Sequence, residues 1–246
     1  MSKLLAALLP LALLSLASVA AQAADGVVLI DQATVLASGG FPYVINTAGS
    51  YRLESNLTAT ASDAIHIVTG DVTLDLNGFT ITGPGTISGA TGISDAGTAH
   101  SGVSILNGNL AQWSFAIALE SCSGCSVERV QATHIVNGIN MGFGALVKEN
   151  RLTGPGGFLE QGNSPRFGNG IVTNNNALVT ENIVSGFGTG ISVVLFSTIS
   201  GNTASSNVIG IEVGCPSNLV GNTAVFETLG GVQENGSGCT RYNNNL

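Results

Sequence analysis

Basic residues are scarce in this chain. Its 246 residues include only seven Lys and Arg against fifteen Asp and Glu, which gives a formal net charge of −8. A protein that binds nucleic acid needs a basic stripe to neutralise phosphates, and an anionic membrane surface makes the same demand. The basic residues beyond the N-terminus are scattered: Arg52, Arg129, Lys148, Arg151, Arg166 and Arg241. The composition therefore excludes both partners.

Long apolar runs are missing beyond the N-terminus. Lys3 is followed by an almost wholly apolar stretch, and Ala21-Gln22-Ala23 fits an A-x-A cleavage signal. This pattern predicts a secretory signal peptide over 1–23, with cleavage near Ala23. A membrane anchor is the alternative, but the run is short for a span of about 20 residues and no basic cluster follows it. We expect a secreted or periplasmic protein without a membrane span.

Charged residues as a whole make up only 9% of the chain, and Lys and Glu, which favour helices, are rare. The 34 glycines on their own suggest a flexible chain. However, 44% of the residues are hydrophobic, so the protein can bury a core. Glycine combined with Asn, Thr, Ser, Val and Ile is a composition of strands and tight turns, and it predicts an all-β protein.

The chain has only four cysteines: Cys122, Cys125, Cys215 and Cys239. Disulfides are the default in an exported protein, and four cysteines allow three pairings. We favour Cys122–Cys125 together with Cys215–Cys239. A redox pair would precede a helix, whereas Cys122 and Cys125 lie in a turn between strands, and a zinc site would need better-grouped ligands.

A short pattern recurs in the second half of the chain. Gly-Ile pairs begin at Gly138, Gly170, Gly190 and Gly210, and an asparagine follows each glycine twelve residues later. Apolar residues also recur at three fixed offsets from each glycine. These columns are Ile139, Ile171, Ile191 and Ile211; Val147, Val179, Ile199 and Leu219; and Leu152, Val184, Ala204 and Ala224. A fixed period of this kind indicates a repeat architecture with three inward-facing strands per coil.

The period selects the fold. A repeat of roughly 20 to 24 residues is too short for a βαβ unit or a propeller blade. Each strand must then pair in parallel with its equivalent one coil away. We predict a parallel β-helix of about eight coils over 63–246, preceded by N-terminal cap strands over 24–62. The recurring asparagines should stack inside as a ladder: Asn150, Asn182, Asn202, Asn222 and Asn243.

The segment Asp71-Val72-Thr73-Leu74-Asp75-Leu76-Asn77-Gly78-Phe79, together with the Gly-Ile repeats and the asparagines, resembles the right-handed parallel β-helix proteins of the pectin lyase-like superfamily. The resemblance covers most of the chain after the signal segment and is closest to small exported bacterial members of undefined role. It implies that the ladder lies in the bend between the second and third strands of each coil. It also implies that a cleft, where there is one, follows the outer face of the first strand.

That outer face can be read from the sequence at the second position after each glycine. The column is Ser94, Ala118, Asn140, Val172, Ser192, Glu212 and Gln233. Glycoside hydrolysis needs two neighbouring carboxylates, and this column has one. A lyase of the pectate type would need an acidic calcium cluster and a basic residue, and neither is visible. The sequence therefore predicts no catalytic residue, metal or cofactor.

Two acidic pairs suggest cation sites. Asp71 and Asp75 flank one strand, but a capping or turn role suits them better. Glu149 and Glu181 share one column, and Arg129 falls close to it, so a solvated ladder of charges is the favoured interpretation.

One irregularity interrupts the repeat. An insertion between Thr153 and Gly168 leads into a first strand, and insertions in solenoids often form a binding face. Its Phe158 and Phe167 could stack on sugar rings, while Glu160 and Arg166 could bind hydroxyls or carboxylates. A tolerated surface insertion is the alternative. We expect an exported non-catalytic module with a structural or interaction role. Extracellular polysaccharide or cell-surface glycan is its candidate ligand, with these residues, Asn140 and Glu212 as the candidate binding residues. The alternative is a carbohydrate-active enzyme, a lyase or glycoside hydrolase, with atypical active-site residues.

Overall fold

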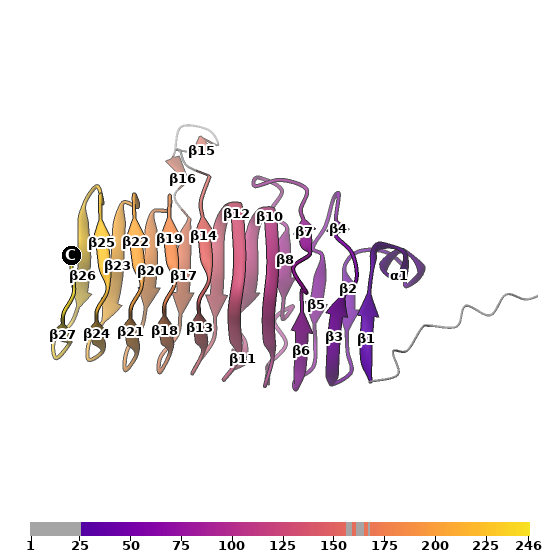
Figure 1. The fold of residues 1–246 in the computed structure, drawn as a ribbon, viewed down its shortest axis with the longest axis horizontal. Coiled ribbons are helices and arrows are strands. Elements are labelled where there is room, and N and C mark those ends of the chain that lie inside the picture. Colours follow the sequence, from indigo (N-terminus) through magenta and orange to yellow (C-terminus); the bar gives the residue numbers. More distant parts are fainter. Residues whose placement is uncertain (1–25, 156–158, 161–164, 167) are drawn as a thin grey trace, which may run out of the picture.

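Alternating apolar residues determine how the strands of this protein stack. The structure is a computed structural model, and it describes residues 26–155, 159–160, 165–166 and 168–246. Ile139, Ile171 and Ile191 follow one another across neighbouring strands that pair in parallel, and all three are buried. Each strand is thus bonded to its equivalent one coil away. The result is an all-β parallel solenoid of about nine coils, as Figure 1 shows.

The strands form three stacks along the solenoid. The first stack contains β2 (Tyr43–Ile45), β5 (Ile65–Ile67), β8 (Thr91–Ser94), β17 (Asn169–Thr173), β20 (Thr189–Val193), β23 (Ile209–Gly214) and β26 (Gly230–Asn235). The second contains β1 (Val27–Ile30), β3 (Gly49–Leu53), β6 (Val72–Asp75), β13 (Leu146–Lys148), β18 (Leu178–Thr180), β21 (Thr198–Ser200), β24 (Asn218–Val220) and β27 (Thr240–Tyr242). The third contains β4 (Leu57–Thr58), β7 (Thr80–Thr82), β14 (Arg151–Thr153), β19 (Ile183–Ser185), β22 (Thr203–Ser205) and β25 (Thr223–Val225).

Two long strands, β10 (Ser104–Leu119) and β12 (Ser126–Met141), run through the second, third and first stacks in turn. Short strands also lie outside the three stacks. The parallel pair β9 (His100–Ser101) and β11 (Cys122–Ser123) lies in the turns after the first stack. The antiparallel pair β15 (Leu159–Glu160) and β16 (Pro165–Arg166) connects β14 to β17.

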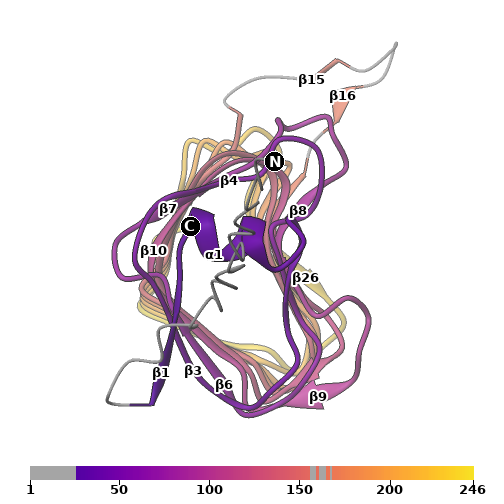
Figure 2. The same ribbon diagram turned by 90° about the vertical axis from the view of Figure 1, so that its right-hand side faces the viewer.

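The N-terminal segment contributes a coil as well as a cover. Strands β2, β3 and β4 pair in parallel with β5, β6 and β7, so residues 43–58 add a coil to the eight that the sequence predicts. Helix α1 (Gln32–Ala37) starts at Asp31, whose carboxylate accepts the backbone N–H of Thr34, and it buries Val35. Figure 2 shows α1 lying across the end of the coils, where it covers the apolar core. The predicted signal peptide over 1–23 lies outside the described residues.

The three predicted apolar columns line the interior. Their members at the first and second offsets, from Ile139 to Leu219, have no exposed surface, and those at the third offset, ending at Ala224, are also buried. The core is therefore a stack of similar side chains, each layer contributed by one coil. Burying an aliphatic side chain stabilises a fold by roughly 1.5–3 kcal/mol, and every coil contributes several.

The predicted asparagine ladder is present in four of its five positions. Asn150, Asn182, Asn202 and Asn222 are buried, and each side-chain oxygen accepts a backbone N–H of the coil before it. Each side-chain amide also donates to a backbone carbonyl of that earlier coil, at 2.8–2.9 Å. The ladder thus satisfies backbone groups at the bend between the second and third stacks.

Asn243 was the wrong choice for the fifth position, because Asn244 accepts the Asn222 N–H at 2.9 Å. The last coil has one extra residue between Gly231 and the ladder, since Ile211 pairs with Val232, 21 residues later, whereas Asn218 pairs with Thr240, 22 residues later. Asn243 instead occupies the left-handed position of the bend, with φ 51°, like Glu149 (56°) and Glu181 (59°) in earlier coils.

Further polar columns, which the sequence analysis missed, satisfy the other bends. The Asn207 oxygen accepts the Phe187 N–H, and the Glu227 carboxylate accepts both the N–H and the side-chain amide of Asn207. In the turn after the first stack, the Ser197 hydroxyl accepts the Ala177 N–H and the Ser217 hydroxyl accepts the Ser197 N–H. Both predicted disulfides are confirmed: Cys122 is bonded to Cys125 and Cys215 to Cys239.

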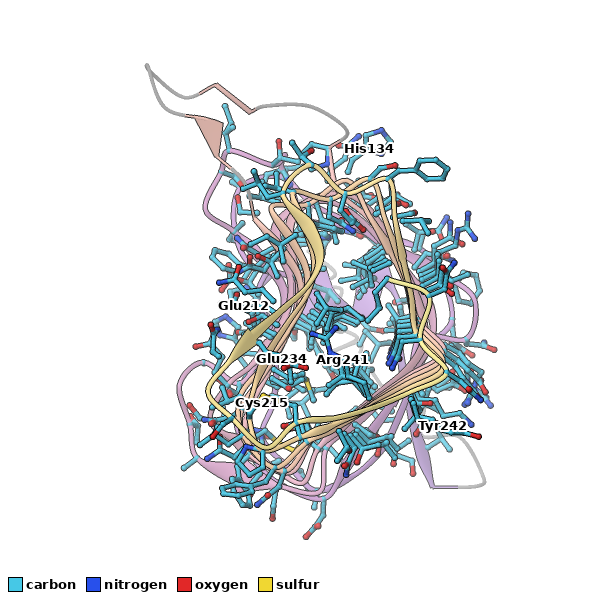
Figure 3. The ribbon with its side chains drawn as sticks, turned by 90° about the vertical axis from the view of Figure 1, so that its left-hand side faces the viewer. His134, Glu212, Cys215, Glu234, Arg241 and Tyr242 are labelled. Atoms are coloured by element: carbon cyan, nitrogen blue, oxygen red, sulfur yellow. A yellow bond between two sulfur atoms is a disulfide. The ribbon has the colours of Figure 1, made fainter. Side chains whose placement is uncertain are left out.

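Charged side chains close the C-terminal end of the core. Glu234 and Arg241 occupy the inward columns that hold Val213 and Leu219 one coil earlier. Their side chains form an ion pair at 2.6 Å, and Figure 3 shows both inside the outline of the last coil. Inward-pointing charges discourage further strands from adding to an open sheet edge.

We predict that Asn202→Ala lowers the free energy of unfolding by about 1–3 kcal/mol, because the substitution leaves the Asn182 N–H and the Val179 carbonyl without their partner. Urea unfolding measures the change. Asn174→Ala is the control, since Asn174 is exposed and, among the described residues, its side chain accepts only the N–H of the next residue, Asn175. Equal stability of the two variants would contradict a stabilising role for the ladder.

Glu227 gives a prediction about pH. Burial raises the pKa of Glu227, although hydrogen bonds from Asn207 oppose the shift. The folded protein therefore binds this proton more tightly than the unfolded chain, so the contribution of Glu227 favours folding at low pH and is lost as the pH rises through its folded pKa. We expect the stability of Glu227→Gln, relative to the parent, to increase between about pH 4 and pH 7. Urea unfolding at several pH values tests this, and a difference independent of pH would contradict it.

Candidate functional site

The outer face of the first stack carries the column predicted from the sequence. Its members lie opposite one another across successive strands: Ala118, Asn140, Val172, Ser192, Glu212 and Gln233. The column continues toward the N-terminus through Ser94, His66 and Val44. The strand register therefore makes this face a continuous strip along the solenoid.

A hollow of about 350 Å³ lies on this strip around Asn140. The Asn140 side-chain amide donates to the Glu120 carboxylate at 3.0 Å, which orients both groups. The hollow is lined by Glu120, Asn140, Met141, Val172, Thr173, Asn174 and Val194. A shallow site with an amide, a carboxylate and apolar walls suits a ligand that has both polar and apolar faces.

Glu120 was missed by the sequence analysis because it belongs to another column. The predicted outward column takes the second residue after each opening residue, whereas Glu120 is the fourth residue after Ala116. Asn174 and Val194 are the fourth residues after Gly170 and Gly190. Side chains alternate along a strand, so both offsets face outward. An inspection of the fourth residue after each opening residue would have included Glu120.

A second carboxylate lies next to this hollow. Asp95 and Glu120 both line an adjoining hollow of about 270 Å³. Asp95 is only 5% exposed, and its two oxygens accept the backbone N–H groups of Gly97 at 2.8 Å and Ser121 at 2.6 Å. The Asp95 carboxylate thus holds the turns after β8 and β10 together.

One unused hydrogen-bonding group lies at the hollow around Asn140. Within the described residues, three buried side-chain atoms have no partner, and one of them, Asn140 Oδ1, belongs to the outward strip at this hollow. Thr173 Oγ1 is also without a partner, but Thr173 belongs to the inward column of Met141 and Val193. Unpartnered buried polar atoms are uncommon in folded proteins. Asn140 Oδ1 is therefore an acceptor on the strip that the protein itself leaves unsatisfied.

Glu212 lies too far along the strip to join Asn140. Three coil spacings separate the two residues, which is about 14 Å. The Glu212 carboxylate instead accepts the Asn235 amide at 2.9 Å and the Ser192 hydroxyl at 3.5 Å. The structure thus separates two residues that the sequence analysis grouped.

The inserted loop and the hollow lie at opposite ends of strand β17. The loop precedes Asn169, where β17 begins, whereas the hollow lies at Thr173 and Asn174, where β17 ends. Glu160 and Arg166 belong to the paired strands β15 and β16, which protrude from the solenoid in Figure 1. Phe158 and Phe167 lie outside the described residues.

Two exposed phenylalanines follow the strands that line the hollow. Phe143 comes two residues after Met141, and Phe196 comes two residues after Val194; their exposed fractions are 49% and 60%. Phe196 has a left-handed backbone with φ 58°, in a turn position that Gly144 (67°) and Asn176 (60°) occupy in earlier coils. A bulky residue in this conformation is strained, and such strain tends to persist at functional positions.

The predicted charge ladder is present around the bend between the second and third stacks. Lys148 contacts Glu149 at 3.1 Å and Glu181 at 3.8 Å, and Arg129 contacts Glu149 at 3.8 Å. The hydrogen bond from Lys148 lowers the pKa of Glu149, with Arg129 contributing. These glutamates are already paired with cations. Asp75 accepts the Asn77 N–H at 2.9 Å, which is the turn role favoured from the sequence.

A group of possible metal ligands lies near the C-terminus. Cys215, Glu234 and Cys239 are close together, but the two cysteines are joined in a disulfide and offer no thiolate.

Within the described part of the chain, no helix is long and apolar enough to cross a membrane.

Comparison with family models, with curated proteins and with solved structures finds no match to this chain. The class of the protein, a parallel β-solenoid with buried asparagines and two disulfides, rests on its own strand pairing and hydrogen bonds.

Proposed function

We propose that this protein is an exported, non-catalytic β-helix that binds extracellular polysaccharide on the outer face of its first stack. The observation that carries the proposal is the hollow at Glu120 and Asn140. The exposed and strained Phe196 follows two residues after Val194, which lines this hollow. Carboxylate and amide groups bind sugar hydroxyls, while the apolar face of a sugar ring packs on an aromatic ring and buries apolar surface. The strip along the solenoid suits an extended polymer better than a small molecule.

The hydrogen bonds that Asp95 accepts support binding without catalysis. An enzyme that hydrolyses glycosides uses two carboxylates, one as a proton donor and the other as a base or nucleophile. Asp95 and Glu120 line one hollow, which is the observation that favours the alternative, a carbohydrate-active enzyme. However, both Asp95 oxygens accept backbone N–H groups, so Asp95 serves the turn.

Two disulfides suggest an oxidising environment outside the cytosol, either extracellular or periplasmic. The apolar segment at 4–19, with Ala21-Gln22-Ala23 after it, supports export through a signal peptide. The parallel coils and the asparagine ladder support membership of the pectin lyase-like superfamily and a right-handed solenoid. This membership is part of the proposal.

We predict that Phe196→Asn weakens polysaccharide binding about tenfold and raises the free energy of unfolding by about 1 kcal/mol, since asparagine adopts the left-handed conformation with less strain. Phe226→Asn is the matched control. Phe226 is also left-handed, at φ 62°, and 86% exposed, but it lies in the turn that follows the third stack. The control should gain similar stability and keep full binding.

Affinity electrophoresis against a panel of polysaccharides measures binding, and reducing-end and unsaturated products are assayed in the same samples. Product formation that Glu120→Gln abolishes would favour the enzyme. Equal loss of binding in both phenylalanine variants would contradict the proposed site. Loss in Phe158→Ala, with Phe196→Asn unaffected, would move the site to the inserted loop.

A further inference from the structure

The face that carries the hollow is acidic. The residues that line its hollows include Asp63, Asp95 and Glu120, and Glu212 lies further along the same strip. None of the residues lining these hollows is a lysine or an arginine. A ligand on this face therefore meets carboxylates, amides, hydroxyls and apolar groups, and the one imidazole among the lining residues, His66, lies against Asp63.

The cations lie elsewhere. Among the side chains that the structure describes, Arg52, Lys148 and Arg151 belong to strands of the second and third stacks, and Arg129 lies in the bend between them. Arg129 and Lys148 are engaged by Glu128, Glu149 and Glu181. Arg241 is paired with Glu234 at the C-terminal end. None of these cations is placed to meet a ligand at the hollow.

The carboxylates of this face are already partly satisfied by donors within the protein. Asp63 accepts the Thr91 N–H at 2.7 Å and lies 2.9 Å from the His66 ring. Asp95 accepts two backbone N–H groups, and Glu212 accepts an amide and a hydroxyl. Carboxylates held in this way act as fixed hydrogen-bond acceptors, and an ionised carboxylate can only accept.

We infer that the polysaccharide is neutral and rich in hydroxyl groups, and this inference rests on the proposed function. A polyuronate would bring its own carboxylates against Glu120 and Asp95 with no cation between them, and like charges at such separations repel. A neutral sugar supplies hydroxyl donors to Glu120, whose second oxygen has no partner among the described residues. Its apolar ring face can pack on Val172 and Val194 of the hollow.

A cationic glycan suits the face less well. The donors that already bond Asp63, Asp95 and Glu212 leave no cluster of free carboxylates for ammonium groups. Apart from Glu120 and Thr173, the walls of the hollow are apolar or amide-bearing, so a strongly hydrated ammonium group meets one carboxylate there and not a cluster.

The test compares binding of the full mature protein to three polymer classes by affinity electrophoresis and calorimetry. The classes are a neutral set (galactomannan, mixed-linkage glucan and arabinoxylan), polygalacturonate with and without added calcium, and chitosan. We expect a neutral polymer to bind at least about tenfold more tightly than the other two classes, with little dependence on salt. Glu120→Gln should weaken neutral binding and strengthen any residual polygalacturonate binding, because the charge is removed.

Glu181→Gln is the matched control, since Glu181 lies in the bend between the second and third stacks, away from the hollow. It should change neither affinity. Tighter binding of polygalacturonate, alone or with calcium, or of chitosan in a salt-sensitive manner, would overturn the neutral class and leave the proposed function standing. Absence of binding to every polymer would overturn both. Equal effects of Glu120→Gln and Glu181→Gln would overturn the role of this hollow.

Discussion

Parallel pairing in register between successive coils is the constraint on which the rest of this structure depends. Because Ile139, Ile171, Ile191 and Ile211 lie directly opposite one another, every other side chain of the coil falls into a column as well. The inward columns make the core and the columns at the bends make hydrogen-bond ladders. The outward columns make a strip whose chemistry changes coil by coil. A binding face can therefore be assembled from single residues of different coils and of the turns between their strands.

Much of this arrangement could be predicted from the sequence, because a strand register repeats whatever the sequence repeats. The three apolar columns, the first four ladder asparagines and the outward column through Asn140 all follow from offsets after the residue that opens each coil. The prediction of the two disulfides rests on separate grounds, since four cysteines occur in a chain expected to be exported. Asn243 was wrong because the last coil has one extra residue between Gly231 and the ladder, so the fixed offset falls on the left-handed position of the bend.

Other features carried no such regular signal. Strands β2, β3 and β4 lack the Gly-Ile pattern, so only their pairing with later strands shows that they form a coil. Asn207 is capped by an acid, Glu227, and a column that changes residue type from coil to coil is hard to recognise. Glu120 and Asp95 come together because turns of neighbouring coils meet, which depends on turn geometry rather than on period.

The proposed site combines a rigid base with one strained residue. Asn140 and Val172 are held by strands bonded on both sides, whereas Phe196 keeps an exposed ring at a backbone angle that costs stability. Hydrogen–deuterium exchange with and without the neutral polysaccharide that binds most tightly tests this account most directly. We expect added protection in peptides covering 118–121, 140–144 and 192–196 and none in 203–205 or 223–225 of the third stack. Protection confined to the third stack, or absent everywhere despite binding, would contradict the account.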